Sequence, residues 1–217
     1  MKRCYFVRHG QTAWNGENRI QGHSDVPLSP LGQEQAKRVG AFFASRHLQA
    51  VFTSSLARSQ QTARAIIDGN GHGVAPVVEE GLVEIHLGVW EGLTPAEIDA
   101  QYNGAYEQWK LRPSMVIIPE AEPVDAFRAR VRRTLEKVLS TCQEDGEYVI
   151  VSHGGVIAAV LADTLGADFD ALLRRLRLDN AGITAVEFGT RLPHVLWINA
   201  TTHLETFLHP PLGHVWF

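Results

Sequence analysis

The stretch CYFVRHG at residues 4–10 joins a short apolar run to a charged ending. Its first four residues are aromatic, β-branched or small and apolar, the pattern of a β-strand buried on both faces. The run ends abruptly at Arg8, His9 and Gly10. The stretch YVIVSHGG at residues 148–155 repeats this arrangement, with one polar residue and then His-Gly after the apolar run. Two buried strands that both end on a histidine are therefore predicted.

Further strands and helices alternate around these two stretches. The same kind of pattern predicts strands at residues 50–53, 74–78, 183–188 and 195–198. Amphipathic or capped segments predict helices at residues 30–46, 56–67, 124–142 and 156–165, and a short helix that begins at residue 95. This alternation indicates an α/β fold, a three-layer α/β/α sandwich with a mostly parallel central sheet and some antiparallel pairing at its end. We expect one domain over residues 1–217, with a small lid excursion at about residues 88–123.

Composition excludes several classes of protein. The 217 residues are 45% hydrophobic and 20% charged, which is ordinary globular usage and excludes disordered, collagen-like and coiled-coil chains. A net charge of −4 gives no general attraction to nucleic acid or anionic lipid. No apolar stretch approaches the ~20 residues that span a bilayer, and the first apolar run is too short for a signal peptide. We therefore expect a cytoplasmic protein without nucleic-acid or membrane partners.

The two strand endings carry the residues suited to chemistry. Ligands of open α/β sheets bind beyond the carboxyl ends of the strands, so His9 and His153 are expected to converge there. Arg8 and Arg58 follow strands as well and add fixed positive charge. Guanidinium groups match phosphate oxygens bidentately, and an imidazole can act as a nucleophile. This set of side chains therefore indicates a phosphoryl group as the ligand.

Five stretches together resemble the histidine phosphatase superfamily, the phosphoglycerate mutase-like proteins. They are FVRHGQT at 6–12 followed by Asn15, LSPLG at 28–32, TSSLARS at 53–59, EIHLGVWEG at 84–92 and VSHGG at 151–155. They follow the family's order over nearly the whole chain, and residues 84–92 resemble its compact phosphatase branch. Residues 119–123, PEAEP, depart from the glycine-rich turn that relatives commonly have there.

The resemblance implies roles for individual residues. It implies that His9 accepts the phosphoryl group, that Glu84 donates and takes protons, and that Arg8, Arg58 and His153 hold the phosphate. It also implies substrate contacts at Asn15, Gln21, Gly22 and Gly154. His9 needs a free lone pair, so its other ring nitrogen is expected to donate to a backbone carbonyl or a similar acceptor. No cofactor or metal is expected, because the other histidines lack a ligand spacing.

These observations predict a histidine acid phosphatase-type phosphomonoesterase. It would hydrolyse a small phosphorylated metabolite through a phosphohistidine intermediate, without metal. Two alternatives remain at this point: a phosphoglycerate mutase-type phosphotransferase, and a non-catalytic interaction module on the same fold. The sequence does not identify the natural substrate, and it leaves open whether the protein forms a homodimer. It also leaves open the roles of His86, His203 and the aromatic tail at 209–217. Trp90 and Trp109 are expected to anchor the lid, and the arginines at 128, 130, 132 and 133 to lie on a solvated helix face.

Overall fold

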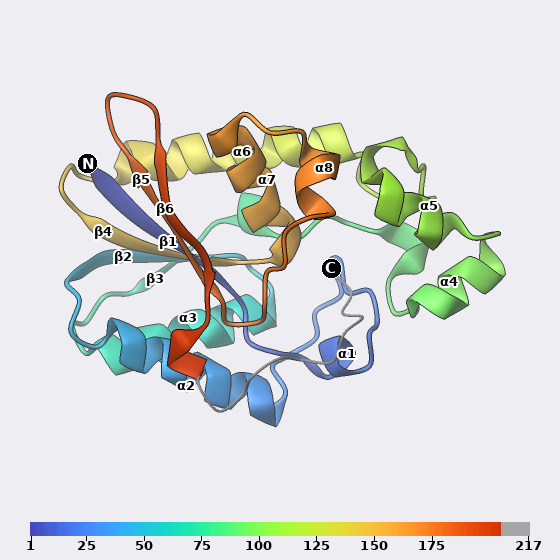
Figure 1. The fold of residues 1–217 in the computed structure, drawn as a ribbon. Helices are drawn as coiled ribbons and strands as arrows, with labels where there is room; N and C mark the ends of the chain where they lie inside the picture. Colours follow the sequence, from blue (N-terminus) through green and yellow to red (C-terminus); the bar gives the residue numbers. More distant parts are fainter. Residues whose placement is uncertain (205–217) are drawn as a thin grey trace.

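A mixed sheet of six strands, in the order β3-β2-β4-β1-β5-β6, forms the centre of the computed structural model, which describes residues 1–204 (Figure 1). The strands are β1 Lys2–Arg8, β2 Leu48–Thr53, β3 Pro76–Val78, β4 Glu147–Ser152, β5 Ile183–Phe188 and β6 His194–Ala200. The first four run parallel to one another, whereas β5 pairs antiparallel with β1 and β6 antiparallel with β5. The predicted mostly parallel sheet with late antiparallel strands is confirmed.

Helices cover both faces of the sheet. Helices α2 (Pro30–Phe43) and α3 (Ala57–Asn70) lie on one face, and α6 (Val124–Thr141) and α7 (Gly154–Leu165) lie on the other (Figure 1). Helix α2 begins as its sequence predicts, because the Ser29 side chain accepts from the Gly32 amide and proline follows at the first helical position. The three-layer α/β/α sandwich is therefore confirmed.

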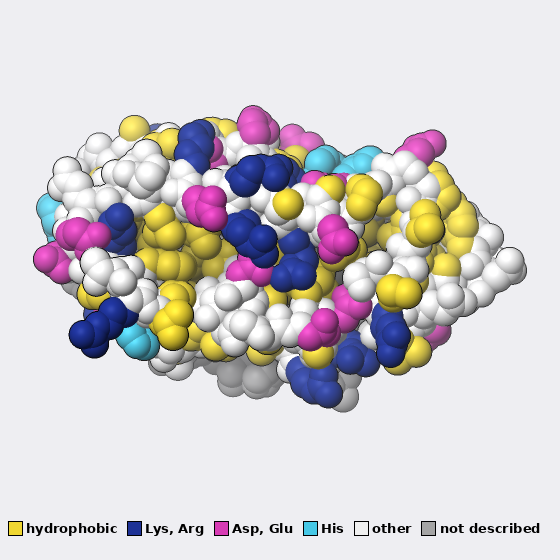
Figure 2. All heavy atoms as spheres, turned by 90° about the horizontal axis from the view of Figure 1, so that it is seen from above, with side chains coloured by type: hydrophobic (Ala, Val, Ile, Leu, Met, Phe, Trp, Pro, Cys, Tyr) yellow, Lys and Arg dark blue, Asp and Glu magenta, His cyan; other side chains and the backbone are white. Residues whose placement is uncertain are grey.

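The outer face of the α6 and α7 layer carries charges of both signs. Figure 2 shows Lys and Arg side chains interspersed with Asp and Glu over this face. Arg128 and Arg132 of α6 both bind Asp163 of α7, at 2.8 and 3.0 Å. Arg130 is different, because its side chain is only 19% exposed and binds Glu122 and three backbone carbonyls. The expectation of a solvated side chain is wrong for Arg130.

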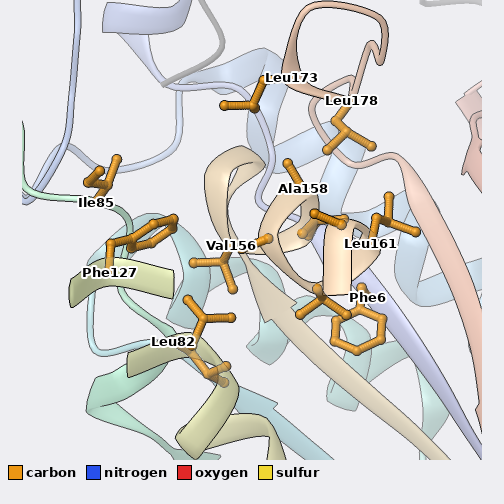
Figure 3. Packing of buried hydrophobic residues seen from close by; sticks show 14 of the residues in the cluster. Phe6, Leu82, Ile85, Phe127, Val156, Ala158, Leu161, Leu173 and Leu178 are labelled. Atoms are coloured by element: carbon orange, nitrogen blue, oxygen red, sulfur yellow. The ribbon is translucent and has the colours of Figure 1, made fainter. Parts of the chain in front are cut away.

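The core on each side of the sheet follows the two-residue period of the strands. In β1, Tyr5 packs toward α2, where its ring meets that of Phe43 edge-on at 5.2 Å between centroids. The next residue, Phe6, points to the other side and joins the cluster of buried side chains under α6 and α7. Figure 3 shows this cluster, with Phe127 of α6 and Val156 of α7 among its members. Burial of such side chains, about 1.5–3 kcal/mol each, fixes the ends of β1 and β4 in place.

The excursion at residues 88–123 forms one end of the molecule (Figure 1). It contains the 3₁₀ turns η2 (Gly88–Trp90) and η3 (Pro113–Met115) and the short helices α4 (Pro95–Gln101) and α5 (Ala105–Leu111). Trp90 and Trp109 are both buried, with ring centroids 6.4 Å apart and ring planes nearly perpendicular, so both tryptophans anchor it as expected. That this excursion acts as a lid stays a prediction.

Four shorter elements complete the described chain. They are α1 (Ala13–Gly16), the 3₁₀ turn η1 (Glu80–Leu82), α8 (Phe169–Leu173) and a final 3₁₀ turn η4 (Thr202–Leu204). Within residues 1–204 no helix is both long and apolar enough to cross a bilayer. Cys4 and Cys142 are free and buried, as expected for small apolar side chains.

Candidate active site

The carboxyl ends of β1 and β4 bring two histidines together. The strands pair parallel with Arg8 opposite Ser152, so His9 and His153 leave adjacent strands at the same edge. Their ring centroids lie 5.2 Å apart, and both rings are buried. The convergence predicted from the repeated strand ending is present.

One ring nitrogen of His9 is fixed by the backbone. Nδ1 lies 2.7 Å from the carbonyl oxygen of Gly10, and a carbonyl only accepts, so Nδ1 carries the proton and Nε2 keeps a lone pair. Burial lowers the pKa of His9 well below its usual 6.5, and the charges of Arg58 and Arg8 lower it further. His9 is therefore a neutral imidazole with its lone pair on Nε2. The expected backbone acceptor is present.

Arg8 and Arg58 place two buried positive charges beside His9. Arg58 donates from Nη1 to the Ser24 carbonyl at 2.7 Å and from Nη2 to the Gly22 carbonyl at 2.8 Å. Arg8 donates from Nη1 to the Leu178 carbonyl. Burial lowers the pKa of Arg58 to about 10, so its guanidinium stays charged at neutral pH. The Nε atoms of both arginines are buried without a hydrogen-bond partner among the described residues.

His153 adds a neutral polar group to this cluster. Its Nε2 lies 2.8 Å from the Ser54 hydroxyl and 3.3 Å from that of Ser59. Its Nδ1 is buried and has no partner within the described part of the chain. Burial lowers the pKa of His153 well below 6.5, and the nearby Arg58 charge acts in the same direction. The ring therefore offers hydrogen bonding without adding charge.

Glu84 is a buried carboxyl group that interacts electrostatically with Arg58 and Arg8. Only 2% of the residue is exposed, and its two oxygens accept from the backbone amides of Ile85 at 2.9 Å and Gly155 at 3.0 Å. Burial raises the pKa of Glu84, and the two amides and the charges of Arg58 and Arg8 offset only part of that effect. Desolvation thus opposes the effect of the two arginines on the pKa of this carboxyl group. A raised pKa suits a group that gives up a proton near neutral pH.

Comparison with known families matches residues 4–201 to the Histidine phosphatase superfamily (branch 1). The chain belongs to this superfamily. A wheat (Triticum aestivum) 2-carboxy-D-arabinitol-1-phosphatase is 34% identical over 89% of the chain, although the chain spans only 39% of that relative. A probable phosphoglycerate mutase GpmB of Serratia proteamaculans (strain 568) is 35% identical over 95% of the chain and 96% of the relative.

Solved structures of similar proteins have the same fold. A mycobacterial glucosyl-3-phosphoglycerate phosphatase, in complexes with VO3, superposes with a TM-score of 0.84 at 30% identity, covering 93% of the chain and 100% of that structure. Membership in the histidine phosphatase superfamily and these matches support a phosphatase activity.

Hydrogen bonds or chain position link the four residues expected to contact substrate to the candidate site. Asn15 accepts from the Thr12 amide at 3.0 Å, and Gln21 accepts from the Thr12 hydroxyl at 2.9 Å. The Nε2 of Gln21 is buried without a partner among residues 1–204. The Gly22 carbonyl accepts a hydrogen bond from Arg58, and Gly154 is the first residue of α7. Their substrate contacts stay predictions.

Asn180 is a polar neighbour of this site that sequence reasoning missed. Its Nδ2 lies 3.2 Å from the carbonyl of His9 and 3.2 Å from Oδ1 of Asn15. Nothing in the spacing of the sequence links residue 180 to residue 9, because the contact arises only when β5 pairs with β1.

The remaining histidines have different surroundings. His203 donates from Nε2 to the Ala181 carbonyl at 3.0 Å and lies against the Phe42 ring. The rings of His23 and His86 lie 4.8 Å apart, and His23 donates to the Glu84 carbonyl at 2.8 Å.

Within residues 1–204 no group of three His, Cys, Asp or Glu side chains could hold a metal ion. The aromatic tail at 209–217, whose role the sequence leaves open, falls outside the described residues.

Proposed function

We propose that this protein hydrolyses small phosphomonoesters through a phosphohistidine intermediate on His9. The observation that carries the proposal is the Nδ1 bond of His9 to the Gly10 carbonyl, which leaves Nε2 unprotonated. Burial and two neighbouring guanidinium groups keep the pKa of this ring well below its usual value, so the ring is a nucleophile at neutral pH without further activation.

In the first step Nε2 of His9 attacks phosphorus, the N–P bond forms and the bond to the ester oxygen breaks. Arg8 and Arg58 offset the negative charge of the phosphate oxygens in a buried site, where such charges act strongly. The Gly10 carbonyl accepts a hydrogen bond from Nδ1–H throughout and so stabilises positive charge that develops on the ring. Protonated Glu84 gives its proton to the departing alkoxide, which leaves as an alcohol.

In the second step a water molecule attacks the phosphorus of the phosphohistidine. The Glu84 carboxylate takes a proton from that water, the N–P bond breaks and inorganic phosphate is released. His9 and Glu84 return to their starting states, so the two steps form a closed cycle. This proposal needs no metal ion.

His153 is proposed to bind a phosphate oxygen with a neutral ring. In this proposal the Ser54 hydroxyl, 2.8 Å away, donates to Nε2, so that the ring proton lies on Nδ1. Nδ1 then donates to the phosphate oxygen. A low pKa keeps His153 from becoming a third positive charge next to His9.

The proposed substrate class is a small phosphorylated metabolite. In support, the wheat relative is named for a sugar-acid phosphate, and the mycobacterial protein is named for a phosphoglycerate derivative. The test is a panel of phosphorylated metabolites incubated with the protein, with released phosphate as the readout. Turnover of at least one of them supports hydrolysis and excludes a non-catalytic interaction module. Failure to release phosphate from any of them contradicts the proposal.

A mutase is the second candidate, because a relative of nearly the same length is named a probable phosphoglycerate mutase. The two reactions share the phosphohistidine and differ in its fate. A mutase returns the phosphoryl group to the glycerate, whereas a phosphatase transfers it to water. Phosphorus NMR of 3-phosphoglycerate with the protein distinguishes them. We expect inorganic phosphate to accumulate, and conversion to 2-phosphoglycerate without phosphate release would favour the mutase.

A further inference from the structure

Glu91 forms a carboxylate clamp next to the proposed phosphate site. It lies directly after η2, and its side chain is only 12% exposed. Its Oε1 accepts from the amides of His23 at 2.8 Å and Leu87 at 3.1 Å. Its Oε2 accepts from the amide of Ser24 at 2.9 Å and from the Ser24 hydroxyl at 2.7 Å. Each oxygen therefore has two donors, and three of the four come from residues 23 and 24.

The loop that Glu91 binds is also the loop that holds Arg58. The carbonyls of Gly22 and Ser24 accept from Nη2 and Nη1 of Arg58, so the loop lies between carboxylate and guanidinium. The next residue of the loop, Asp25, accepts from the Ala57 amide at 2.6 Å, in the first turn of the helix that carries Arg58. The loop thus fixes both the guanidinium of Arg58 and the start of its helix.

Gly22 fits this arrangement because a larger residue would collide with the clamp. A Cβ atom at position 22 would lie 2.0 Å from Oε1 of Glu91, and the backbone φ of +49° is one that L residues rarely adopt. The glycine therefore lets the loop turn tightly over the carboxylate. Its carbonyl then points to Arg58.

Charge adds to this geometric link. Arg58 donates to two carbonyl oxygens of the loop, so its position depends on how firmly the loop is held. Burial lowers the pKa of Arg58, and the nearby carboxylates, Glu91 among them, act in the opposite direction. Glu91 thus helps to keep the buried guanidinium charged.

We infer that Glu91 is a positioning residue that sets the pose of Arg58 through the loop at residues 22–25. The inference rests on the proposed function, since it assigns Arg58 to the phosphate site. Removal of the carboxylate leaves the amides of His23 and Ser24 without their acceptor, so the loop and its carbonyls shift. Small displacements of a positioning group cost up to about 100-fold in rate.

The test is a double-mutant cycle with Glu91→Ala and Arg58→Ala, measured on binding of inorganic phosphate by calorimetry and on kcat and KM for p-nitrophenyl phosphate. We expect Glu91→Ala to weaken phosphate binding and lower kcat/KM by about 10- to 100-fold in the wild-type background. In the Arg58→Ala background the same change should alter both quantities by no more than about twofold. Equal losses in the two backgrounds would overturn the inference.

Asp170 provides a matched control. Its carboxylate also accepts from a backbone amide and the hydroxyl of one serine, Ser114, but that serine belongs to η3 and not to the Arg58 loop. We expect Asp170→Ala to lower stability without changing phosphate affinity. Glu91→Gln keeps the side-chain volume, and it replaces Glu91→Ala in the cycle if the alanine variant does not fold. It should show the same coupling to Arg58 with a smaller loss.

The binding readout separates this inference from the proposed function. If no phosphomonoester is hydrolysed but phosphate affinity shows the coupling between Glu91 and Arg58, the proposed function fails and the positioning role is supported. If phosphomonoesters are hydrolysed and the two substitutions act additively, the positioning role fails and the proposed function is unaffected.

Discussion

Replacement of Glu84 by glutamine separates proton donation from the other effects of this residue. Glutamine has nearly the same shape but cannot give a proton to a leaving group. Donation matters most when the departing alkoxide is a strong base, and little when a phenolate leaves without help. Glu84→Gln should therefore slow phosphoryl transfer from an alkyl phosphate far more than from p-nitrophenyl phosphate.

The contacts of Glu84 set the size of the expected difference. Its two oxygens each accept one backbone amide, from Ile85 and from Gly155. A glutamine must turn its NH₂ group toward one of them, which leaves a buried amide without its acceptor, about 1–3 kcal/mol. At about 1.4 kcal/mol per tenfold, that is about 5- to 140-fold, and it is the same for both substrates. Loss of a general acid costs about 10²- to 10⁴-fold, and only for the alkyl phosphate.

The assay is single-turnover phosphoryl transfer for both substrates in wild type and Glu84→Gln, so that a shared hydrolysis step does not mask the difference. We expect the alkyl phosphate to lose at least about tenfold more rate than p-nitrophenyl phosphate. Equal losses for the two substrates would mean that Glu84 positions substrate and that another group is the acid. His86, whose side chain is 37% exposed beside Glu91, would be the first to test.

Three further predictions concern the site and its stability. Gly22→Ala should lower the free energy of unfolding by about 1–2 kcal/mol, because alanine disfavours the left-handed backbone, and it should also lower kcat/KM. Gly16→Ala, whose Cβ would meet no atom within 4 Å, should change neither quantity. Denaturant titration and steady-state kinetics measure the two variants. Prolonged chelation should leave activity unchanged, and loss that zinc or manganese restores would contradict a metal-independent reaction. Burial holds the pKa of His9 and His153 well below 6.5. Below about pH 6.5 the unfolded chain therefore binds more protons than the folded one, and the free energy of unfolding should fall as the pH drops further. His153→Gln should reduce that slope by about 1.4 kcal/mol per pH unit, and an unchanged slope between pH 6 and 5 in denaturant titrations would contradict the lowered pKa.

Local sequence patterns predict the strands of the sheet and the histidines that follow two of them, because each pattern spans only a few neighbouring residues. The run before His9 is apolar over its whole length, so it predicts a buried strand, and its repeat before His153 predicts the second. The structure brings His9, His153, Arg8, Arg58 and Glu84 together, and their roles stay predictions. Short elements such as α5 and α8 carry too few turns for a periodic signal, and the sequence did not predict them.

Other features depend on contacts between distant parts of the chain. Arg130 looks like one of several exposed arginines on α6, but it donates to the carbonyls of Gly81, Val83 and Glu84. The raised pKa of Glu84 comes from burial, which no local pattern shows. Asn180 reaches His9 across 171 residues of sequence. Such contacts are set by packing and cannot be read from spacing.

The most direct test of the proposed mechanism is the location of the phosphoryl group on the enzyme. The protein is mixed with labelled substrate, quenched in alkali within one turnover and digested, and the labelled peptide is sequenced by mass spectrometry. The mechanism predicts a base-stable, acid-labile phosphoryl group on His9, and no label or activity in His9→Ala. A label on His153 or on another residue, or full activity in His9→Ala, would contradict it.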